Sequence, residues 1–180
     1  MVPTIAALHR SDAHTFSKAP AEALTLLAGL GVEGDAHCGA TVRHRSRVAI
    51  DPHQPNLRQV HLITTEILDD LRTRGYDVAP GDLGENVTTT GIDLHGLPTG
   101  TLIRLGDSAL VALTGLRNPC QQIETFRRGL LRQVVGKDGD GDIVRRAGVM
   151  AVVVQGGDVR RGDCIVAQLP PPPLTPLAKV

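Results

Sequence analysis

The sequence is poor in aromatic side chains. Of its 180 residues none is Trp, one is Tyr and two are Phe, so the core must be built from aliphatic side chains. Proteins that hold single-stranded nucleic acid offer aromatic platforms for the bases, and such a partner is therefore not expected. Basic and acidic residues both number 19. This balance leaves no overall field that would attract nucleic acid or an anionic membrane.

Cysteine is also scarce. The three cysteines, Cys38, Cys120 and Cys164, are widely spaced, and none belongs to a CxxC pair. The chain alone therefore cannot supply a four-cysteine zinc or iron–sulfur site. The first residues lack the features of a signal peptide, and no apolar run approaches the ~18 residues of a membrane span. We expect a cytoplasmic protein with reduced thiols and no membrane partner.

What the sequence does contain is a regular series of turn signals. Gly-Asp pairs begin at residues 34, 81, 106, 139, 141, 157 and 162, and both residue types favour turns. Short β-prone runs occur at 4–8, 59–63, 85–89, 101–105, 109–114, 149–155 and 164–169. Such runs predict a mainly β, barrel-like α+β fold rather than a doubly wound one. The length suits a single domain, over residues 1–169.

Two helices are predicted. The first spans residues 65–74, with Thr64 as N-cap and Gly75 as the stop. The second spans 121–135, where apolar residues recur at helical spacing and Gly129 is a weak point. The proline-rich C-terminal tail, residues 170–180, cannot join a central strand. We expect it to be extended and disordered, with a PxxP ligand as the alternative.

The stretch RNPC, residues 117–120, places a cysteine directly after a proline. If a helix begins at residue 121, the positive end of its dipole favours a thiolate at Cys120, and Arg117 lies nearby. The alternative is a small buried side chain at a turn. No histidine lies in this loop, so a base for nucleophilic catalysis would have to come from elsewhere in the fold. Cys164 begins an apolar strand, which favours a structural role.

Reactive side chains are densest in residues 31–48. Potential metal ligands there are Glu33, Asp35, His37 and Cys38, and potential phosphate ligands are Arg43, His44, Arg45 and Arg47. In a strand, alternation would point the three arginines in one direction. The alternative is a glycine-rich turn followed by a solvated basic strand. Glu85 and Asn86, further along, are either pocket residues or polar side chains of a structural turn.

Six motifs follow one another in a characteristic order. They are GVEGDAHCG (31–39), LRQVHLI (57–63), PGDLGENVTTTGIDLHGLPTGTLIRLG (80–106), RNPC (117–120), AGVMAVVVQGG (147–157) and RRGDCI (160–165). Together they resemble the MOSC domain, named for the C-terminal domain of molybdenum cofactor sulfurase. The resemblance covers about residues 31–166 and implies a β-rich, barrel-like fold. It implies binding of the molybdenum cofactor, a pterin with a dithiolene and a phosphate; pyridoxal phosphate is not expected.

The resemblance also assigns site residues. The characteristic cysteine of the family maps onto Cys120, which would ligate molybdenum as a thiolate, a soft ligand that suits this metal. Candidates for the cofactor phosphate and the pyranopterin edge are Arg43, Arg45, Arg47 and Arg58. Further pocket candidates are His37, Glu85, Asn86, Arg117 and Asn118.

The activity that the resemblance implies is reduction of small N-hydroxylated compounds. The sequence lacks the C-x₄-C-x₂-C pattern of members fused to a ferredoxin, and it has no room for the additional N-terminal domain of mitochondrial relatives. Electrons are therefore expected from a separate flavoprotein or ferredoxin. Two alternatives remain open: a sulfur carrier with a persulfide on Cys120, and a module that holds the cofactor without turnover.

Overall fold

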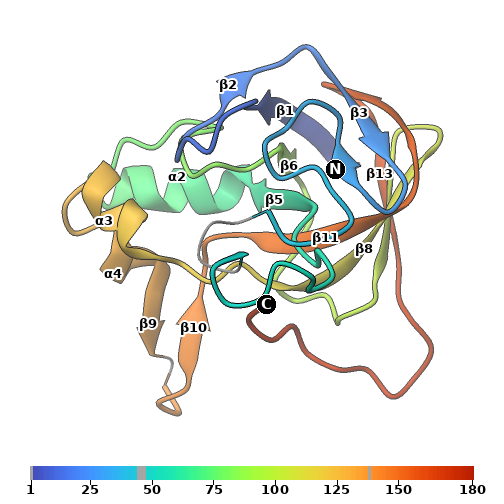
Figure 1. Cartoon of the computed structure of the whole chain (residues 1–180). Coiled ribbons are helices and arrows are strands. Elements are labelled where there is room, and N and C mark those ends of the chain that lie inside the picture. Colours follow the sequence, from blue (N-terminus) through green and yellow to red (C-terminus); the bar gives the residue numbers. More distant parts are fainter. Residues whose placement is uncertain (1, 44–47, 138) are drawn as a thin grey trace.

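The computed structural model describes residues 2–43, 48–137 and 139–180 (Figure 1). Its main sheet has eight strands in the order β13-β7-β8-β11-β5-β6-β1-β2. They are β1 (Thr4–Arg10), β2 (Ala19–Pro20), β5 (Val60–Thr64), β6 (Val87–Thr90), β7 (Leu102–Leu105), β8 (Ala109–Leu116), β11 (Val149–Gln155) and β13 (Ile165–Gln168). Neighbouring strands are antiparallel, except that β5 and β6 are parallel.

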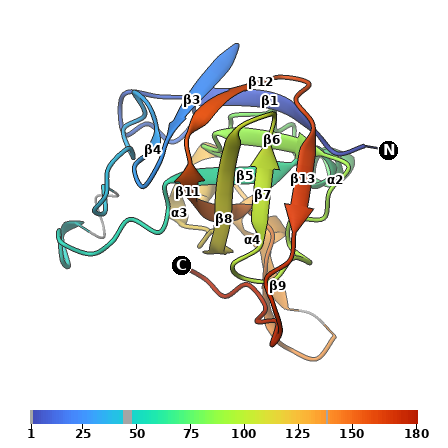
Figure 2. The same ribbon diagram turned by 90° about the vertical axis from the view of Figure 1, so that its right-hand side faces the viewer.

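The main sheet curls until its two ends approach each other (Figure 2). The backbone of Ile5, in β1, donates a 2.9 Å hydrogen bond to the carbonyl of Asp163, and that of Ile165, in β13, donates one of 2.9 Å to Pro3. These bonds connect β1 with the chain that enters the edge strand β13. The fold is therefore mainly β and barrel-like, as the turn pattern predicted.

Smaller elements complete the β structure. A three-stranded sheet contains β12 (Gly157–Arg160), β3 (Ala23–Leu27) and β4 (Gly31–Val32), in that order, and β9 (Val135–Lys137) pairs with β10 (Ile143–Arg145). All the predicted β-prone runs overlap strands of the main sheet, so these predictions are confirmed, with ends shifted by a few residues. The strands β2, β3, β4, β9, β10 and β12 were not predicted, because most are too short to show alternation.

Aliphatic side chains form two buried clusters, as the lack of aromatics required. One fills the curled sheet and includes Leu62, Ile103 and Val149. The other lies beneath the helices and includes Ile63 and Leu68. Consecutive residues of β5 therefore contribute to different clusters, because side chains alternate along a strand. His61 shares a face with Ile63, on the helical side of the sheet.

The first predicted helix is confirmed as α2 (Thr65–Thr73). The Ile67 backbone N–H donates to the Thr64 hydroxyl at 3.4 Å, and Gly75 follows with φ +84°. Both features are ordinary helix-end devices. No helix in the described parts of the chain has the length and apolar character needed to cross a bilayer.

The second predicted helix is wrong as a continuous element. It is divided into α3 (Gln121–Phe126) and α4 (Leu131–Val134). Gly129 between them has φ +83°, a conformation that favours glycine and interrupts a helix. The carboxylate of Glu124 accepts hydrogen bonds from the backbone of Gly129, at 2.7 Å, and of Leu131, at 3.3 Å. These bonds replace the helical ones and fix the bend.

The expectation of a disordered tail is also wrong. Leu177 is only 9% exposed and belongs to the cluster inside the sheet. The backbone of Leu116 donates to the carbonyl of Ala178 at 2.7 Å, and that of Thr99 donates to Thr175 at 2.8 Å. Proline removes a donor but leaves the carbonyl acceptors intact. The tail therefore pairs with the domain mainly as an acceptor.

Candidate functional site

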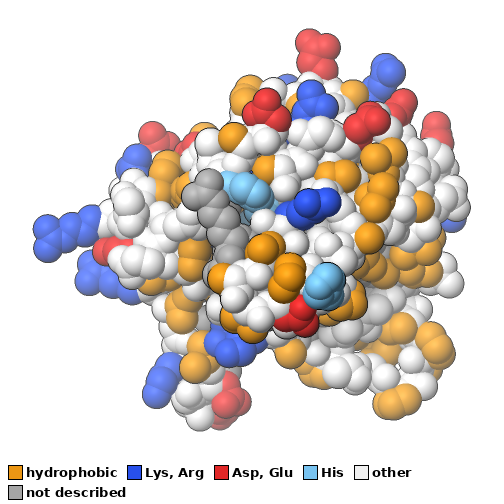
Figure 3. Space-filling view, viewed as in Figure 1, with side chains coloured by type: hydrophobic (Ala, Val, Ile, Leu, Met, Phe, Trp, Pro, Cys, Tyr) orange, Lys and Arg blue, Asp and Glu red, His pale blue; other side chains and the backbone are white. Residues whose placement is uncertain are grey.

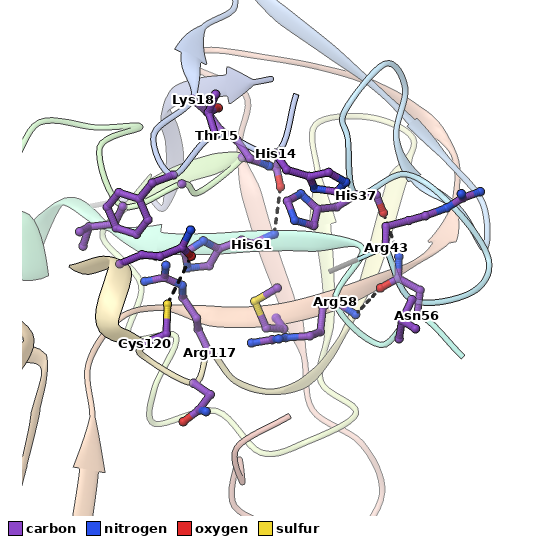
Figure 4. Close-up of a pocket in the computed structure, with 18 of the residues that line it drawn as sticks. His14, Thr15, Lys18, His37, Arg43, Asn56, Arg58, His61, Arg117 and Cys120 are labelled. Carbon is purple, nitrogen blue, oxygen red and sulfur yellow. Dashed lines mark hydrogen bonds between the residues drawn. The ribbon is translucent and has the colours of Figure 1, made fainter. Parts of the chain in front are cut away.

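A cavity of about 450 Å³ opens beside Cys120 (Figure 4). Its lining comes from separate parts of the chain: the loop after β1, the segments 37–43 and 56–58, β5, the loop before β6, the residues from Arg117 to the start of α3, and β11. The lining side chains used below are Lys18, His37, Arg43, Asn56, Arg58, His61, Asn86, Arg117, Asn118, Cys120, Gln121 and Gln122.

The inner wall of the cavity is built around Asn86. Its side-chain oxygen accepts from the His61 backbone at 3.2 Å, and its nitrogen donates to the Asp35 carboxylate at 2.9 Å. The same Asp35 oxygen accepts from Lys18 Nζ at 2.6 Å. Asn86 thereby connects β5 to the loop that follows β4. Asn86 therefore lines the cavity and also makes structural hydrogen bonds, while its role in cofactor binding stays a prediction.

Asp35 is the buried counter-ion of this wall. Its side chain is 2% exposed, and His37 donates to it from the backbone, at 2.9 Å, and approaches it with Nδ1 at 3.2 Å. Burial raises the pKa of Asp35, but the hydrogen bonds from His37 and the charge of Lys18 outweigh it and hold that pKa well below its usual range. Asp35 is therefore an ion-pair partner that orients Lys18 and His37.

His61 faces the cavity from β5. Its Nε2 lies 2.8 Å from the carbonyl of Ala147, and since a carbonyl only accepts, Nε2 carries the proton. Burial holds the pKa of His61 well below 6.5. The imidazole is therefore neutral and supplies a polar but uncharged wall.

Arg117 and Cys120 occupy opposite ends of the RNPC loop. The Arg117 backbone donates to Gly148 at 3.0 Å, which attaches the loop to the chain entering β11. Its Nη1 atom is buried and has no hydrogen-bond partner among the residues described. Burial lowers the pKa of Arg117 to about 10, with Cys120 and Glu85 opposing this. The guanidinium remains charged at neutral pH and has a free donor for an anionic ligand.

Cys120 is half-buried at the edge of the cavity. It is the N-cap of α3, as the sequence predicted, and its thiol donates to Gln122 Oε1 at 3.4 Å. The alternative interpretation, a small buried side chain at a turn, is therefore wrong. The helix has only six residues, so its dipole would stabilise an anion at Cys120 less than the dipole of a long helix would.

Most of the predicted site residues come together. Seven of them line the cavity: His37, Arg43, Arg58, Asn86, Arg117, Asn118 and Cys120. Arg45 and Arg47, with His44, lie outside the described residues. Glu85 does not line the cavity. It is fully buried, and its Oε1 accepts from the backbone of Gly81 at 2.6 Å.

The potential metal ligands Glu33, Asp35, His37 and Cys38 are not gathered into a metal site in the described part of the chain. Within the described ranges, no three His, Cys, Asp or Glu side chains are grouped so as to hold a metal ion. Asp35 is committed to Lys18 and His37, and Glu33 is exposed. Cys38 is half-buried but does not line the cavity, and burial raises the pKa of its thiol.

Sequence reasoning missed Lys18 and His61. His61 stands within the motif LRQVHLI, between apolar residues of a buried strand, and that context is the signal that could have indicated it. Lys18 lies in a loop with no motif around it. Its burial depends on Asp35, and only the folded structure brings the two together.

The lining has a pronounced charge bias. Four of its described side chains are cationic, Lys18, Arg43, Arg58 and Arg117, and no aspartate or glutamate is among those described. Amides contribute donors and acceptors from Asn56, Asn86, Asn118, Gln121 and Gln122. Such a cavity suits an anionic organic ligand with a phosphate and a hydrogen-bonding heterocycle. The thiol of Cys120 is placed to bind a soft metal that such a ligand carries.

The fold and the cavity define a class: a barrel-like β domain with a cationic pocket and a cysteine at its edge. The MOSC domain family matches residues 49–166, well over half of the chain. The chain belongs to the MOSC domain family.

The chain is also similar to a much longer protein. The chain is 28% identical over 142 residues to a protein of Gibberella moniliformis named "Reductase". The match covers 74% of this chain but 24% of that protein, so the chain spans about a quarter of the length of this relative.

Solved structures share the fold. The YuaD protein of Bacillus subtilis superposes with a TM-score of 0.77 at 24% identity, over 95% of this chain and 98% of that one. YiiM of Escherichia coli gives 0.62 at 20% identity, over 97% of this chain and 73% of that one. At these identities the likeness establishes the fold alone.

Proposed function

We propose that this protein binds the molybdenum cofactor in the cavity and uses it to reduce N-hydroxylated small molecules. The single observation that carries the proposal is the cavity itself, in which Cys120 stands at the edge of a cationic lining with no aspartate or glutamate among its described residues. Membership of the MOSC family and the distant relative named "Reductase" support the proposal.

Different residues of the chain would bind different parts of the cofactor. Arg43, Arg58 and Arg117 would neutralise the phosphate and hold the polar edge of the pterin, because guanidinium groups bind phosphate through paired donors. Cys120 would contribute a thiolate to the metal. Once bound, the cofactor supplies two-electron oxygen-atom-transfer chemistry.

Reduction of an N-hydroxylated compound consumes two electrons and two protons and releases an amine-type product and water. Lys18 and His37 both line the cavity and both contact Asp35. They would keep exchangeable protons at the wall, while the Asp35 carboxylate holds their orientation. Burial lowers the pKa of His61 and keeps it neutral, so His61 would add no charge to its side of the pocket.

The direct test is the content of native protein purified from cells that make the cofactor. We expect molybdenum and pterin in about equal amounts with the chain, loss of both in Cys120→Ala, and retention in Cys164→Ala. Cys164 is the matched control because it is exposed and absent from the cavity lining. Wild-type protein without molybdenum or pterin would overturn the proposal.

A sulfur carrier is the second candidate. Its support is the half-buried thiol of Cys120 in the same loop as Arg117, because a persulfide is an anion that a guanidinium stabilises. Mass spectrometry of the native protein separates the candidates. A carrier would show one added sulfur on Cys120 and no stoichiometric metal. Cofactor without reductase activity, given a competent donor, would instead indicate a binding module.

A further inference from the structure

Three exposed arginines lie together where α3 ends and α4 begins: Arg127, Arg128 and Arg132. We call them the basic patch. Although the whole chain is neutral, residues 109–137 have five basic side chains and one acidic. In Figure 3, Lys and Arg side chains gather at the side of the molecule where Figure 1 shows α3 and α4.

The charges of the basic patch are not neutralised by the fold. None of its arginines forms an ion pair with another side chain in the described part of the chain. The arginines at the C-terminal end of α2 provide the contrast, since Arg72 pairs with Asp69 and the C-cap residue Arg74 pairs with Asp70. The acidic residue of α3, Glu124, directs both oxygens to the backbone of the bend. The positive charges of the patch therefore remain available to attract an acidic partner.

The basic patch adjoins the mouth of the cavity. Gln121 and Gln122 are exposed and also line the cavity, so the first turn of α3 forms part of its rim. Cys120 precedes that turn, and Arg127 follows the last residue of the helix. At 1.5 Å per residue, the patch begins about 10 Å from Cys120. A protein seated on the patch would therefore reach the rim of the site.

We infer that the basic patch is the docking surface for an acidic electron-transfer protein, which delivers electrons to the site beside Cys120. The inference rests on the proposed function, because only a reductase needs such a donor. Two one-electron deliveries from the reduced carrier, with two protons from solvent, balance the conversion of one N–O bond to an amine-type product and water. Opposite charge at the contact would steer encounter and set orientation.

The experiment compares donors and variants on cofactor-loaded full-length protein. The donors are a reduced acidic [2Fe–2S] ferredoxin, a reduced acidic flavodoxin, and dithionite-reduced methyl viologen, which is small and needs no docking surface. The variants are R127E/R128E/R132E and the milder R127Q/R128Q/R132Q. The matched control, R104E/R160E/R161E, reverses three exposed arginines, one in β7, one at the end of β12 and one in the turn after it. Circular dichroism verifies the fold of each.

With at least one acidic protein donor, we expect wild-type kcat/KM to fall steeply as salt rises from low to high concentration. R127E/R128E/R132E should lower kcat/KM with that donor by about 10-fold or more at low salt and abolish the salt dependence. The glutamine variant should show a smaller loss, and the control should stay within about 2-fold of wild type. Direct binding of the donor should weaken in the same order, which is a readout independent of turnover.

The outcomes separate this inference from the proposed function. No turnover with methyl viologen in cofactor-loaded wild type would overturn the proposed function. Viologen-driven turnover without binding or turnover with either acidic protein would overturn the docking inference alone. So would an equal loss in the control variant, or patch-dependent binding of an RNA or DNA oligonucleotide in place of the acidic proteins.

Discussion

The inner wall and the outer rim of the cavity are held in place in different ways. The wall, formed by Lys18, Asn86 and His61 around Asp35, is a network of buried hydrogen bonds between distant segments. The rim, formed by Cys120 and the first turn of α3, is exposed or half-buried, and the thiol contacts a side chain only two residues away.

Because of this difference, substitutions in the wall should affect stability, and substitutions in the rim should affect ligand binding. Removal of one member of the wall leaves a buried polar or charged group without its partner, which the fold tolerates poorly. A change in the rim removes a group that the fold does not use. The same cavity therefore combines residues that build the domain with residues that are available for a ligand, and substitutions should distinguish them.

The largest effect is expected from Asp35→Ala. It leaves the ammonium of Lys18 buried without a counter-ion, and loss of one partner of a buried pair costs about 3–5 kcal/mol. Urea unfolding of the cofactor-free protein measures the change. Asp107→Ala, at an exposed position in a turn, is the control and should change the free energy of unfolding by less than about 0.5 kcal/mol. Equal losses in the two variants would contradict the role assigned to the wall.

The C-terminal tail provides the next test, because it supports the root of the RNPC loop. Leu177 is buried in the core, and its neighbour Ala178 accepts from Leu116, directly before Arg117. Leu177→Ala should lower the free energy of unfolding by about 2 kcal/mol, at the low end for a buried leucine. Leu174→Ala, at a position 51% exposed, should be close to neutral. If both variants unfold like wild type, the tail does not contribute to the core.

A pH titration tests the neutral histidine in the wall. Because the folded-state pKa of His61 is lowered, its contribution to stability is complete above the unfolded pKa of about 6.5 and is lost as pH falls below that value. The slope from one such group approaches about 1.4 kcal/mol per pH unit. His61→Gln should reduce the slope of unfolding free energy against pH between about 5 and 6.5. An unchanged slope would show that His61 is not the group responsible.

The smallest effect on stability is expected at the rim. Cys120→Ala should change the free energy of unfolding by less than about 0.5 kcal/mol, because the thiol is half-buried and has one weak hydrogen bond. Chemical denaturation of the cofactor-free protein is the measurement. A loss of more than about 1.5 kcal/mol would give Cys120 a structural role and remove the contrast between rim and wall.

Much of the fold was predictable from local pattern. The strands of the main sheet alternate or run apolar between turns, and α2 has a side-chain N-cap and a stop glycine, so short-range rules suffice for both. The error in the second predicted helix has a local cause too. The helical period at residues 121–135 is real, but Gly129 adopts positive φ and Glu124 binds the bend. Helix propensity alone does not reveal that the glycine and the glutamate together end the helix at this point.

Site residues could be predicted only where the residue type and its neighbours in the sequence already indicate a function. The sequence was enough to identify the thiol after a proline, to propose Arg43, Arg58 and Arg117 as site residues and to recognise the family of the domain. The inner wall and the docked tail depend on contacts between distant segments, which only the folded chain makes. Lys18, Asp35, His61 and Asn86 are far apart along the chain and become one network only when β5, β6 and the loops around them assemble. The tail is ordered for the same reason, since its carbonyl groups have partners only on the folded domain.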